Sequence, residues 1–341
     1  MSHRLSHIVL LYNEDTEILH GAPTDSIAVQ STVATAESVF QALLELEYPV
    51  YKAAIRESLE EIEQHLSAFD RRSTLVFNCC DGFRGVNRGA VDVIRRLEEL
   101  GFAHTGANFA SAQACIYKPI TKAILIANGV ETPAYQVFHS PNESFRLPFP
   151  AIVKPAAEDG SIGITHNSVV TNLRELRREV ERVLVLYCQP ALVETFIPGR
   201  EFSVSILGNQ SPEILPIAEQ DYSRISDPLA QLLTYQSKWD PAAPEYYDIP
   251  ALVPADLSKS EEQLVRETAR RAFQALGLRD LGRIDLRLLN GIPYVLEVNE
   301  LPDLAPEAGF WNSARAAGMT YPQLIDRIVQ HALKREGWTL S

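Results

Sequence analysis

The stretch GRIDLRLLNGIPYVLEVNELPDL, residues 282–304, restricts the fold more than any other segment of the chain. Two runs rich in Ile, Leu and Val flank Asn290-Gly291, a pair typical of β-hairpin turns. Even positions along both runs carry Ile, Leu, Tyr or Val. The charged and amide side chains occupy odd positions: Arg283, Asp285, Arg287, Glu297 and Asn299. We therefore expect one face of the hairpin to be buried and the other to point into a cavity or solvent.

The turn decides whether the two strands present matching faces. A two-residue turn would pair Leu289 with Ile292 and mix the apolar and charged faces. A three-residue loop, 289–291, pairs Leu288 with Ile292 instead and keeps every even residue on one face. Because a one-residue change of register moves a strand's side chains to the other face, we predict the three-residue loop, with Gly291 left-handed.

Strands and helices alternate over the first hundred residues. Buried strands are predicted at 7–12 and 74–79, a short strand at 49–55, and helices at 33–47, 57–69 and 89–100. Gly101 suits a left-handed cap at the end of the last of these helices. This alternation predicts a parallel sheet with helices on its faces.

From Lys118 onward the pattern changes to smaller α+β units. Helices are predicted near 118–128, 172–185, 260–276 and 321–334, and strands at 134–138, 150–154, 191–197 and 201–208. The polar, proline-rich stretch 220–256 is long for a structureless loop and indicates a functional loop or lid. We predict three units: an N-terminal α/β domain (1–115), a central α+β unit (116–208) and a C-terminal α+β unit (209–341) that carries the polar hairpin face.

Composition excludes several classes of protein. The net charge of -13 argues against nucleic acid as a partner, because phosphate backbones need a basic surface. No apolar run has the length of a membrane span, and the first residues lack a signal-peptide pattern, so we expect a cytoplasmic protein. The four cysteines show no C-x-x-C spacing and no nearby His pair, which predicts reduced thiols.

The polar hairpin face offers ligands for a hard cation. Asp285, Glu297 and Asn299 supply the oxygen atoms that Mg²⁺ prefers, and substrate phosphates commonly complete its shell. Arg283 on the same face can meet negative charge that develops in phosphoryl or acyl transfer. A solvated hairpin face is the alternative interpretation of these residues alone.

Two further stretches suit a nucleotide. AIVKPAAEDGSIGIT, residues 151–165, is a strand ending in a lysine and a glycine-rich loop, whose N–H groups can cover phosphates, although it matches neither a P-loop nor a dinucleotide fingerprint. VETFIPGREFSV, residues 193–204, can offer a strand edge to adenine and a carboxylate to ribose. A hairpin turn with an exposed lysine and a plain strand connection are the alternatives.

Together these stretches resemble the ATP-grasp superfamily, and within it the D-alanine:D-alanine ligases. The likeness follows the order of the chain: HTGANFASAQACIYKPITK (104–122), AIVKPAAEDGSIGI (151–164), LVETFIPGREFSVSILG (192–208), GRIDLRLL (282–289), LEVNELPDL (296–304) and ARAAGMTYPQLI (314–325). The resemblance implies an N-terminal α/β domain, a central subdomain that clasps ATP and a C-terminal subdomain with the metal site.

The resemblance also implies roles for single residues. Lys118 and Lys154 are expected to hold the ATP phosphates under a loop from Glu158 to Ile164, which includes Gly160, Ser161 and Gly163. Glu194, Thr195, Phe196 and Ile197 are expected to line adenine, and Glu201 to face ribose. The catalytic candidates are Arg283, the lid lysine Lys238 and Ser161; Asp285, Glu297 and Asn299 are expected to bind two magnesium ions.

The departures from the D-alanine ligase pattern lie on the substrate side. Gly160 replaces the first serine of a pair in the phosphate loop, and Trp239 replaces a tyrosine after the lid lysine. CCDGFRGVNRG (79–89) replaces an HG...GEDG stretch, and the serine that follows the metal-binding asparagine is missing from NELPDLAPEAG (299–309). We therefore expect a substrate other than two D-alanines.

The resulting hypothesis is an ATP-dependent C–N ligase that joins an amino acid amine to a phosphorylated small molecule and releases ADP and phosphate. Ligases that attach an amino acid to mycosporine-glycine, giving an imine, fit the pattern, and the resemblance implies a homodimer. A divergent D-alanine ligase and a non-catalytic ATP-binding regulator are the alternatives. An NAD-dependent oxidoreductase is disfavoured, because YNEDTEILHG follows the first strand where a glycine fingerprint would stand.

Overall fold

A four-stranded parallel sheet forms the centre of the N-terminal unit. The computed structural model describes residues 4–15, 19–22, 26–83 and 88–340, without the side chains of 26–30. The strands lie in the order β2-β1-β3-β4, with bounds β1 His7–Asn13, β2 Val50–Ile55, β3 Thr74–Asn78 and β4 Ala103–His104. This arrangement confirms the parallel sheet that the alternation predicts.

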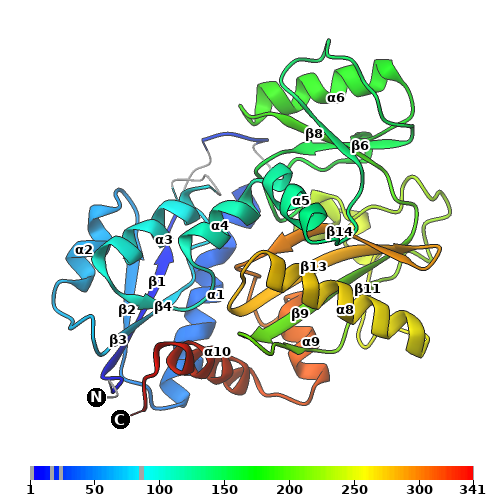
Figure 1. Cartoon of the computed structure of the whole chain (residues 1–341). Coiled ribbons are helices and arrows are strands. Elements are labelled where there is room, and N and C mark those ends of the chain that lie inside the picture. Colours follow the sequence, from blue (N-terminus) through cyan, green and yellow to red (C-terminus); the bar gives the residue numbers. More distant parts are fainter. Residues whose placement is uncertain (1–3, 16–18, 23–25, 84–87, 341) are drawn as a thin grey trace.

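Helices cover both faces of this sheet (Figure 1). α1 (Ser26–Glu45) and α10 (Tyr321–Glu336) pack on one face, and α2 (Glu60–Leu66) and α3 (Gly89–Leu100) pack on the other. Gly101 caps α3 with φ 75°, as predicted.

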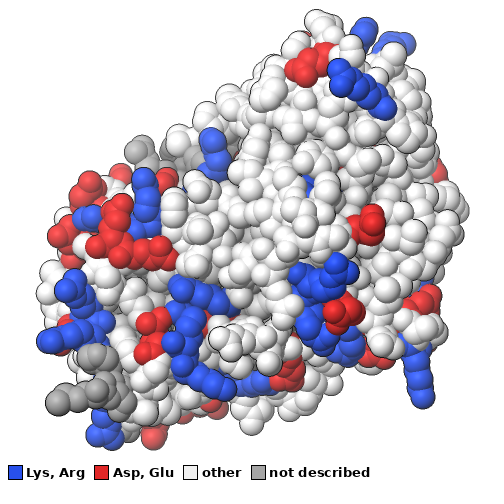
Figure 2. All heavy atoms as spheres, viewed as in Figure 1, with Lys and Arg blue, Asp and Glu red and all other residues white. Residues whose placement is uncertain are grey.

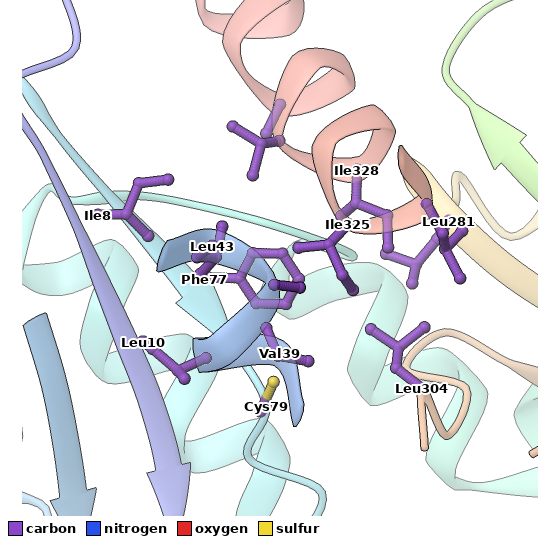
Figure 3. Close-up of a cluster of buried hydrophobic side chains, with 14 of the residues drawn as sticks. Ile8, Leu10, Val39, Leu43, Phe77, Cys79, Leu281, Leu304, Ile325 and Ile328 are labelled. Carbon is purple, nitrogen blue, oxygen red and sulfur yellow. The ribbon is translucent and has the colours of Figure 1, made fainter. Parts of the chain in front are cut away.

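The last helix of the chain belongs to the N-terminal core. Figure 3 shows Ile8 of β1 and Leu43 of α1 in one buried cluster with Ile325 and Ile328 of α10. The two ends of the chain meet there, since the backbone N–H of Leu5 donates to the carbonyl of Thr339 at 2.9 Å. The predicted C-terminal unit, 209–341, therefore includes a helix that packs on the N-terminal sheet.

The central unit is a smaller antiparallel sheet with strand order β5-β8-β6-β7. Its bounds are β5 Tyr135–Phe138, β6 Ala151–Pro155, β7 Val169–Val170 and β8 Ala191–Thr195. α6 (Leu173–Leu186) packs apolar side chains against β6 and β8, and the short helix η2 (His166–Ser168) precedes β7.

The third sheet is antiparallel, in the order β12-β11-β9-β13-β14, with β10 beside β9. Its bounds are β9 Arg200–Gly208, β10 Glu213–Ile214, β11 Ala218–Gln220, β12 Ala251–Leu252, β13 Asp280–Leu289 and β14 Ile292–Asn299. α4 (Phe109–Ile116), α5 (Lys118–Ala127) and α8 (Lys259–Ala275) share its core, and α9 (Gly309–Ala316) contacts β9 and β11. β9 pairs with this sheet and not with the central one.

The hairpin turn differs from the prediction. Leu289 pairs with Ile292, so the turn has two central residues and the predicted pairing of Leu288 with Ile292 is wrong. Asn290 and Gly291 are both left-handed, with φ 52° and 77°. This is the conformation of a type I′ turn, whose twist matches that of the strands it joins.

A β-bulge in β14 restores the alignment of the charged residues. Leu286 pairs with Val295 and Asp285 pairs with Glu297, so Leu296 is an extra residue in β14. Asp285 and Glu297 therefore lie directly opposite each other on one face, and Arg283 lies opposite Asn299. The predicted all-even apolar face is wrong beyond the bulge, because Val295 is fully buried and Ile292 is 41% exposed.

Other expectations from composition can be compared with the structure. Cys79, Cys80, Cys115 and Cys188 are free thiols. Within the described ranges no helix is both long and apolar enough to cross a membrane. On the face in Figure 2, the basic side chains of the described residues are interspersed with acidic ones and form no continuous stripe.

Candidate active site

A cavity of about 600 Å³ lies where the central sheet, the C-terminal sheet and α1 meet. It contains most of the residues predicted to bind nucleotide or metal. Those that line it are Lys118, Lys154, Glu158, Ser161, Glu194, Thr195, Phe196, Ile197, Glu201, Lys238, Arg283, Asp285 and Glu297. Gly160, Gly163 and Asn299 adjoin the site without lining the cavity. The structure thus brings together side chains that are far apart in the sequence.

The predicted metal ligands stand together at one end of the cavity. Asp285 on β13 faces Glu297 on β14, and the amide nitrogen of Asn299 donates to Asp285 Oδ2 at 2.9 Å. Arg283 donates two hydrogen bonds to the same carboxylate, from Nε to Oδ1 at 2.9 Å and from Nη2 to Oδ2 at 2.8 Å. This end therefore offers two carboxylates and an amide oxygen beside a guanidinium.

Lys118 connects the predicted phosphate site with the predicted metal site. Its Nζ lies 2.7 Å from Glu297 Oε1 and also donates to the carbonyl of Glu158. Burial alone would raise the pKa of Glu297, but the charges of Lys118 and Lys154 outweigh it and lower that pKa to about 2. Glu297 is therefore ionised at neutral pH.

The other end of the cavity holds a buried carboxylate between two lysines. Glu194 on β8 has Oε2 2.8 Å from Lys154 Nζ and Oε1 2.7 Å from Lys122 Nζ. Burial opposes ionisation of Glu194, but the two ammonium groups lower its pKa. Phe196, which follows β8 and is also predicted to line adenine, is buried. The guanidinium of Arg287 lies over its ring, 4.9 Å from the ring centre.

Arg287 also positions the predicted ribose residue. Arg287 Nη2 lies 2.7 Å from Glu201 Oε2, and the Tyr222 hydroxyl donates to the same oxygen at 3.0 Å. Arg287 stands opposite Glu201 in the β13–β9 pairing, so two neighbouring strands fix this contact. Glu201 is thereby held at the cavity wall.

The predicted phosphate loop, between β6 and η2, contains three residues with a left-handed backbone. Gly160, Ser161 and Gly163 have φ 57°, 63° and 79°. A Cβ atom on Gly163 would lie 2.5 Å from Pro155 Cγ, so this glycine allows close packing behind the loop and does not itself face the cavity. Glu158 accepts a hydrogen bond from Gln189 at 2.7 Å, and burial raises its pKa to about 7.

The predicted lid closes over this loop. The stretch 220–256 is not structureless, since it contains α7 (Tyr235–Trp239), η3 (Pro244–Tyr247) and β12. The indole Nε1 of Trp239 donates to the carbonyl of Gly160 at 2.7 Å. Lys238 faces the cavity, and burial together with the charge of Arg283 lowers its pKa.

Sequence reasoning gave no role to several residues at the site. α1 and the segment after β14 complete the wall of the cavity with Ser31, Thr35, Ser38, Asp303, Glu307 and Asn312. Lys122 and Arg287 were also missed. The sequence contains a signal for each of them: Lys122 follows Lys118 by one helical turn, and Arg287 lies on the charged face of the hairpin. Part of the substituted stretch 79–89 lies outside the described residues.

Comparison with known proteins gives a consistent result. The family model described as D-ala D-ala ligase C-terminus matches residues 125–330. An uncharacterized protein, y4sG, of Sinorhizobium fredii is 34% identical over 78% of this chain and 76% of its own. A D-alanine–D-alanine ligase of Pseudothermotoga lettingae is 30% identical over 89% of this chain and 95% of its own.

A solved structure shows the same fold. The D-alanine–D-alanine ligase from Bacillus anthracis complexed with ATP superposes with a TM-score of 0.75 at 23% identity, over 97% of this chain and 98% of that one. Fold and family matches together define an ATP-dependent ligase with the ATP-grasp architecture. The chain belongs to the D-alanine–D-alanine ligase-like family of the ATP-grasp superfamily.

Proposed function

We propose that the protein uses ATP and Mg²⁺ to activate an oxygen of a small acceptor and then joins the acceptor to an amino acid amine. The observation that carries this proposal is the joint placement, in one cavity, of Lys118, Lys154 and Arg283 with Asp285 and Glu297. Cations suit the phosphates, and the paired carboxylates suit the metal. A protein that only binds nucleotide has no need of Arg283 at the metal end.

The donor set fits magnesium. Among the described residues no three His, Cys, Asp or Glu side chains surround one point, so a closed all-protein cage is not the arrangement here. Two carboxylates and an amide leave positions for phosphate oxygens, which is how Mg²⁺ binds in nucleotide sites. When bound, the metal would neutralise phosphate charge. Asp285, Glu297 and Asn299 would hold it.

The residues of the chain would act mainly by position and charge. Lys118 and Lys154 would bind phosphate oxygens, Ser161 and the left-handed loop would cover them, and Lys238 would close from the lid. The γ-phosphoryl group would move to the acceptor oxygen with release of ADP. The amine would then attack the activated carbon, inorganic phosphate would leave and the amine would lose a proton. Arg283 would stabilise the negative charge of this step.

We further propose that the acceptor is an enolisable ketone of the mycosporine-glycine type, so that the product is an imine. The substituted residues support this choice. Trp239 covers Gly160 where D-alanine ligases carry a tyrosine and a serine, and Ala308 and Gly309, from the stretch 299–309 that lacks a serine, line the cavity. The homodimer implied by the resemblance stays a prediction.

Phosphate release from ATP across a panel of amino acids, with and without a cyclohexenone-type acceptor, tests the proposal. Release that needs both an amino acid and the acceptor is expected, with an imine product by mass spectrometry. Efficient D-alanyl-D-alanine synthesis would instead identify a divergent D-alanine ligase. Nucleotide binding without phosphate release on any pair would contradict the ligase assignment of these residues.

A further inference from the structure

Lys122 is a charged side chain that does not line the cavity but pairs with Glu194, which does. It lies on α5 and is 1% exposed. Its ammonium donates to Thr132 Oγ1 at 2.6 Å and to the Pro133 carbonyl at 3.4 Å, and it forms an ion pair with Glu194 Oε1 at 2.7 Å. Burial and these three contacts leave a substrate no approach to it. Lys122 can therefore act only through the groups that it holds.

Glu194 is the one of these groups that reaches the cavity. Its side chain is buried between Lys122 behind it and Lys154 on the cavity wall. Two cations on one carboxylate exceed what neutralisation requires. Taking a lysine out of water is costly, and burial with the nearby lysines lowers the pKa of Lys122 to about 8 even beside Glu194. An arrangement this costly needs a reason other than stability.

The second lysine, Lys154, explains why Glu194 has two cationic partners. Under the proposed function, on which this inference rests, Lys154 turns to a nucleotide phosphate and withdraws from Glu194. A buried carboxylate left alone would take up a proton. We propose that Lys122 is a positioning residue that keeps Glu194 ionised and in place after Lys154 has engaged phosphate, so that Glu194 selects a 6-aminopurine nucleotide.

The chemistry of selection follows from the charge of Glu194. An ionised carboxylate only accepts hydrogen bonds, so it favours the 6-amino group of adenine and repels the 6-carbonyl of hypoxanthine. A protonated carboxyl can donate to that carbonyl and loses the discrimination. Thr132 supports the same geometry, because its hydroxyl accepts from Lys122 and donates to the Val295 carbonyl at 2.7 Å.

Calorimetric titration with ADP and with inosine diphosphate, each with Mg²⁺, tests this role. The two ligands share ribose and phosphates and differ at the purine 6-position. The wild-type protein should prefer ADP by about tenfold or more, the usual range for a hydrogen bond to a charged group. Lys122→Met should reduce that preference to within about threefold of unity. Its KM for ATP should rise more than its kcat falls.

Lys52→Met is the matched control, since Lys52 also pairs with a glutamate, Glu37, but lies outside the cavity. It should keep the wild-type preference. If Lys122→Met does not fold, Lys122→Gln decides, because its amide can still donate a hydrogen bond but carries no charge. The same fall in the preference for ADP is expected, and an unchanged preference would overturn the inference.

Two results would overturn the inference and leave the proposed function standing. One is a folded Lys122→Met protein with the wild-type preference for ADP. The other is a wild-type protein that binds both diphosphates equally. A protein that binds neither diphosphate would instead count against the proposed function itself.

Discussion

Lys118 Nζ and Glu297 Oε1 lie 2.7 Å apart and join the predicted phosphate site to the predicted metal site. The pair makes stability depend on pH. The pKa of Glu297 in the folded protein, about 2, lies below its ordinary value of 4.5, so its contribution is present above pH 4.5 and is lost as the pH falls toward 2.

We therefore expect Glu297→Gln to flatten the pH dependence of unfolding. Between pH 5 and pH 3 the wild-type protein should lose about 2 kcal/mol more free energy of unfolding than the variant, from the 1.36 kcal/mol that one pKa unit represents. Denaturant titration across this range measures the difference. Glu57→Gln, at an exposed carboxylate, is the control and should follow the wild-type curve. Parallel curves for Glu297→Gln and wild type would show that the pair is not formed in solution.

Asp285→Asn should abolish most turnover while the protein stays folded. The substitution keeps the shape of the side chain and can still accept from Arg283, but it removes one negative ligand from the proposed metal site. We expect phosphate release to fall by about a hundredfold or more. Asp326→Asn on α10, where Asp326 accepts from Tyr48 at 2.6 Å, is the control away from the cavity. Undiminished release in Asp285→Asn would remove Asp285 from the metal site.

Trp239→Phe should make ATP hydrolysis less dependent on the acceptor. Phenylalanine keeps an aromatic ring over the phosphate loop but cannot donate to the Gly160 carbonyl, so the lid is held less firmly. Because a closed lid excludes water from the activated intermediate, we expect acceptor-independent phosphate release to rise a few-fold. Trp338→Phe, near the C-terminus, should leave it unchanged. No rise in Trp239→Phe would indicate that other contacts close the lid.

The lid stretch 220–256 should gain protection from hydrogen exchange when ADP and Mg²⁺ bind. Tyr222 and the carbonyl of Gln231 contact the Glu201–Arg287 pair, so a nucleotide that orders this pair also orders the lid. Mass spectrometry of peptides from this stretch measures the effect, and peptides from β1 provide the reference. Protection equal in both regions would favour general stabilisation over lid closure.

How far the sequence predicts this molecule depends on whether the signal is local. A strand, a lysine and several glycines follow one another directly at 151–165, and the resemblance to the ATP-grasp superfamily predicts a phosphate-binding role for Lys154 and this loop. The docking of α10 on the N-terminal sheet was missed, because an amphipathic pattern says that one helix face is buried but not which partner buries it.

The site shows the same limit at the level of single contacts. Arg287 and Glu201 meet because β13 and β9 are neighbours, and no local rule brings residues of separate segments into register. The hairpin error has a different origin. The Asn290-Gly291 pair favours a two-residue turn, whereas the alternation of apolar and charged residues favours a three-residue loop. A bulge reconciles the two, and it leaves no comparable mark in the sequence.

The bulge at Leu296 has a consequence for how this hairpin can change in evolution. The tip beyond it takes its register from the turn, whereas the pairs Asp285–Glu297 and Arg283–Asn299 lie on the other side of the break. Insertions or deletions at the tip can therefore be accommodated without turning the carboxylates of Asp285 and Glu297 away from one another. Loss of the residue at 296 would keep every existing pair, because its neighbours Val295 and Glu297 already pair with the consecutive residues Leu286 and Asp285. Leu296 is thus the residue of the hairpin whose deletion disturbs the register least.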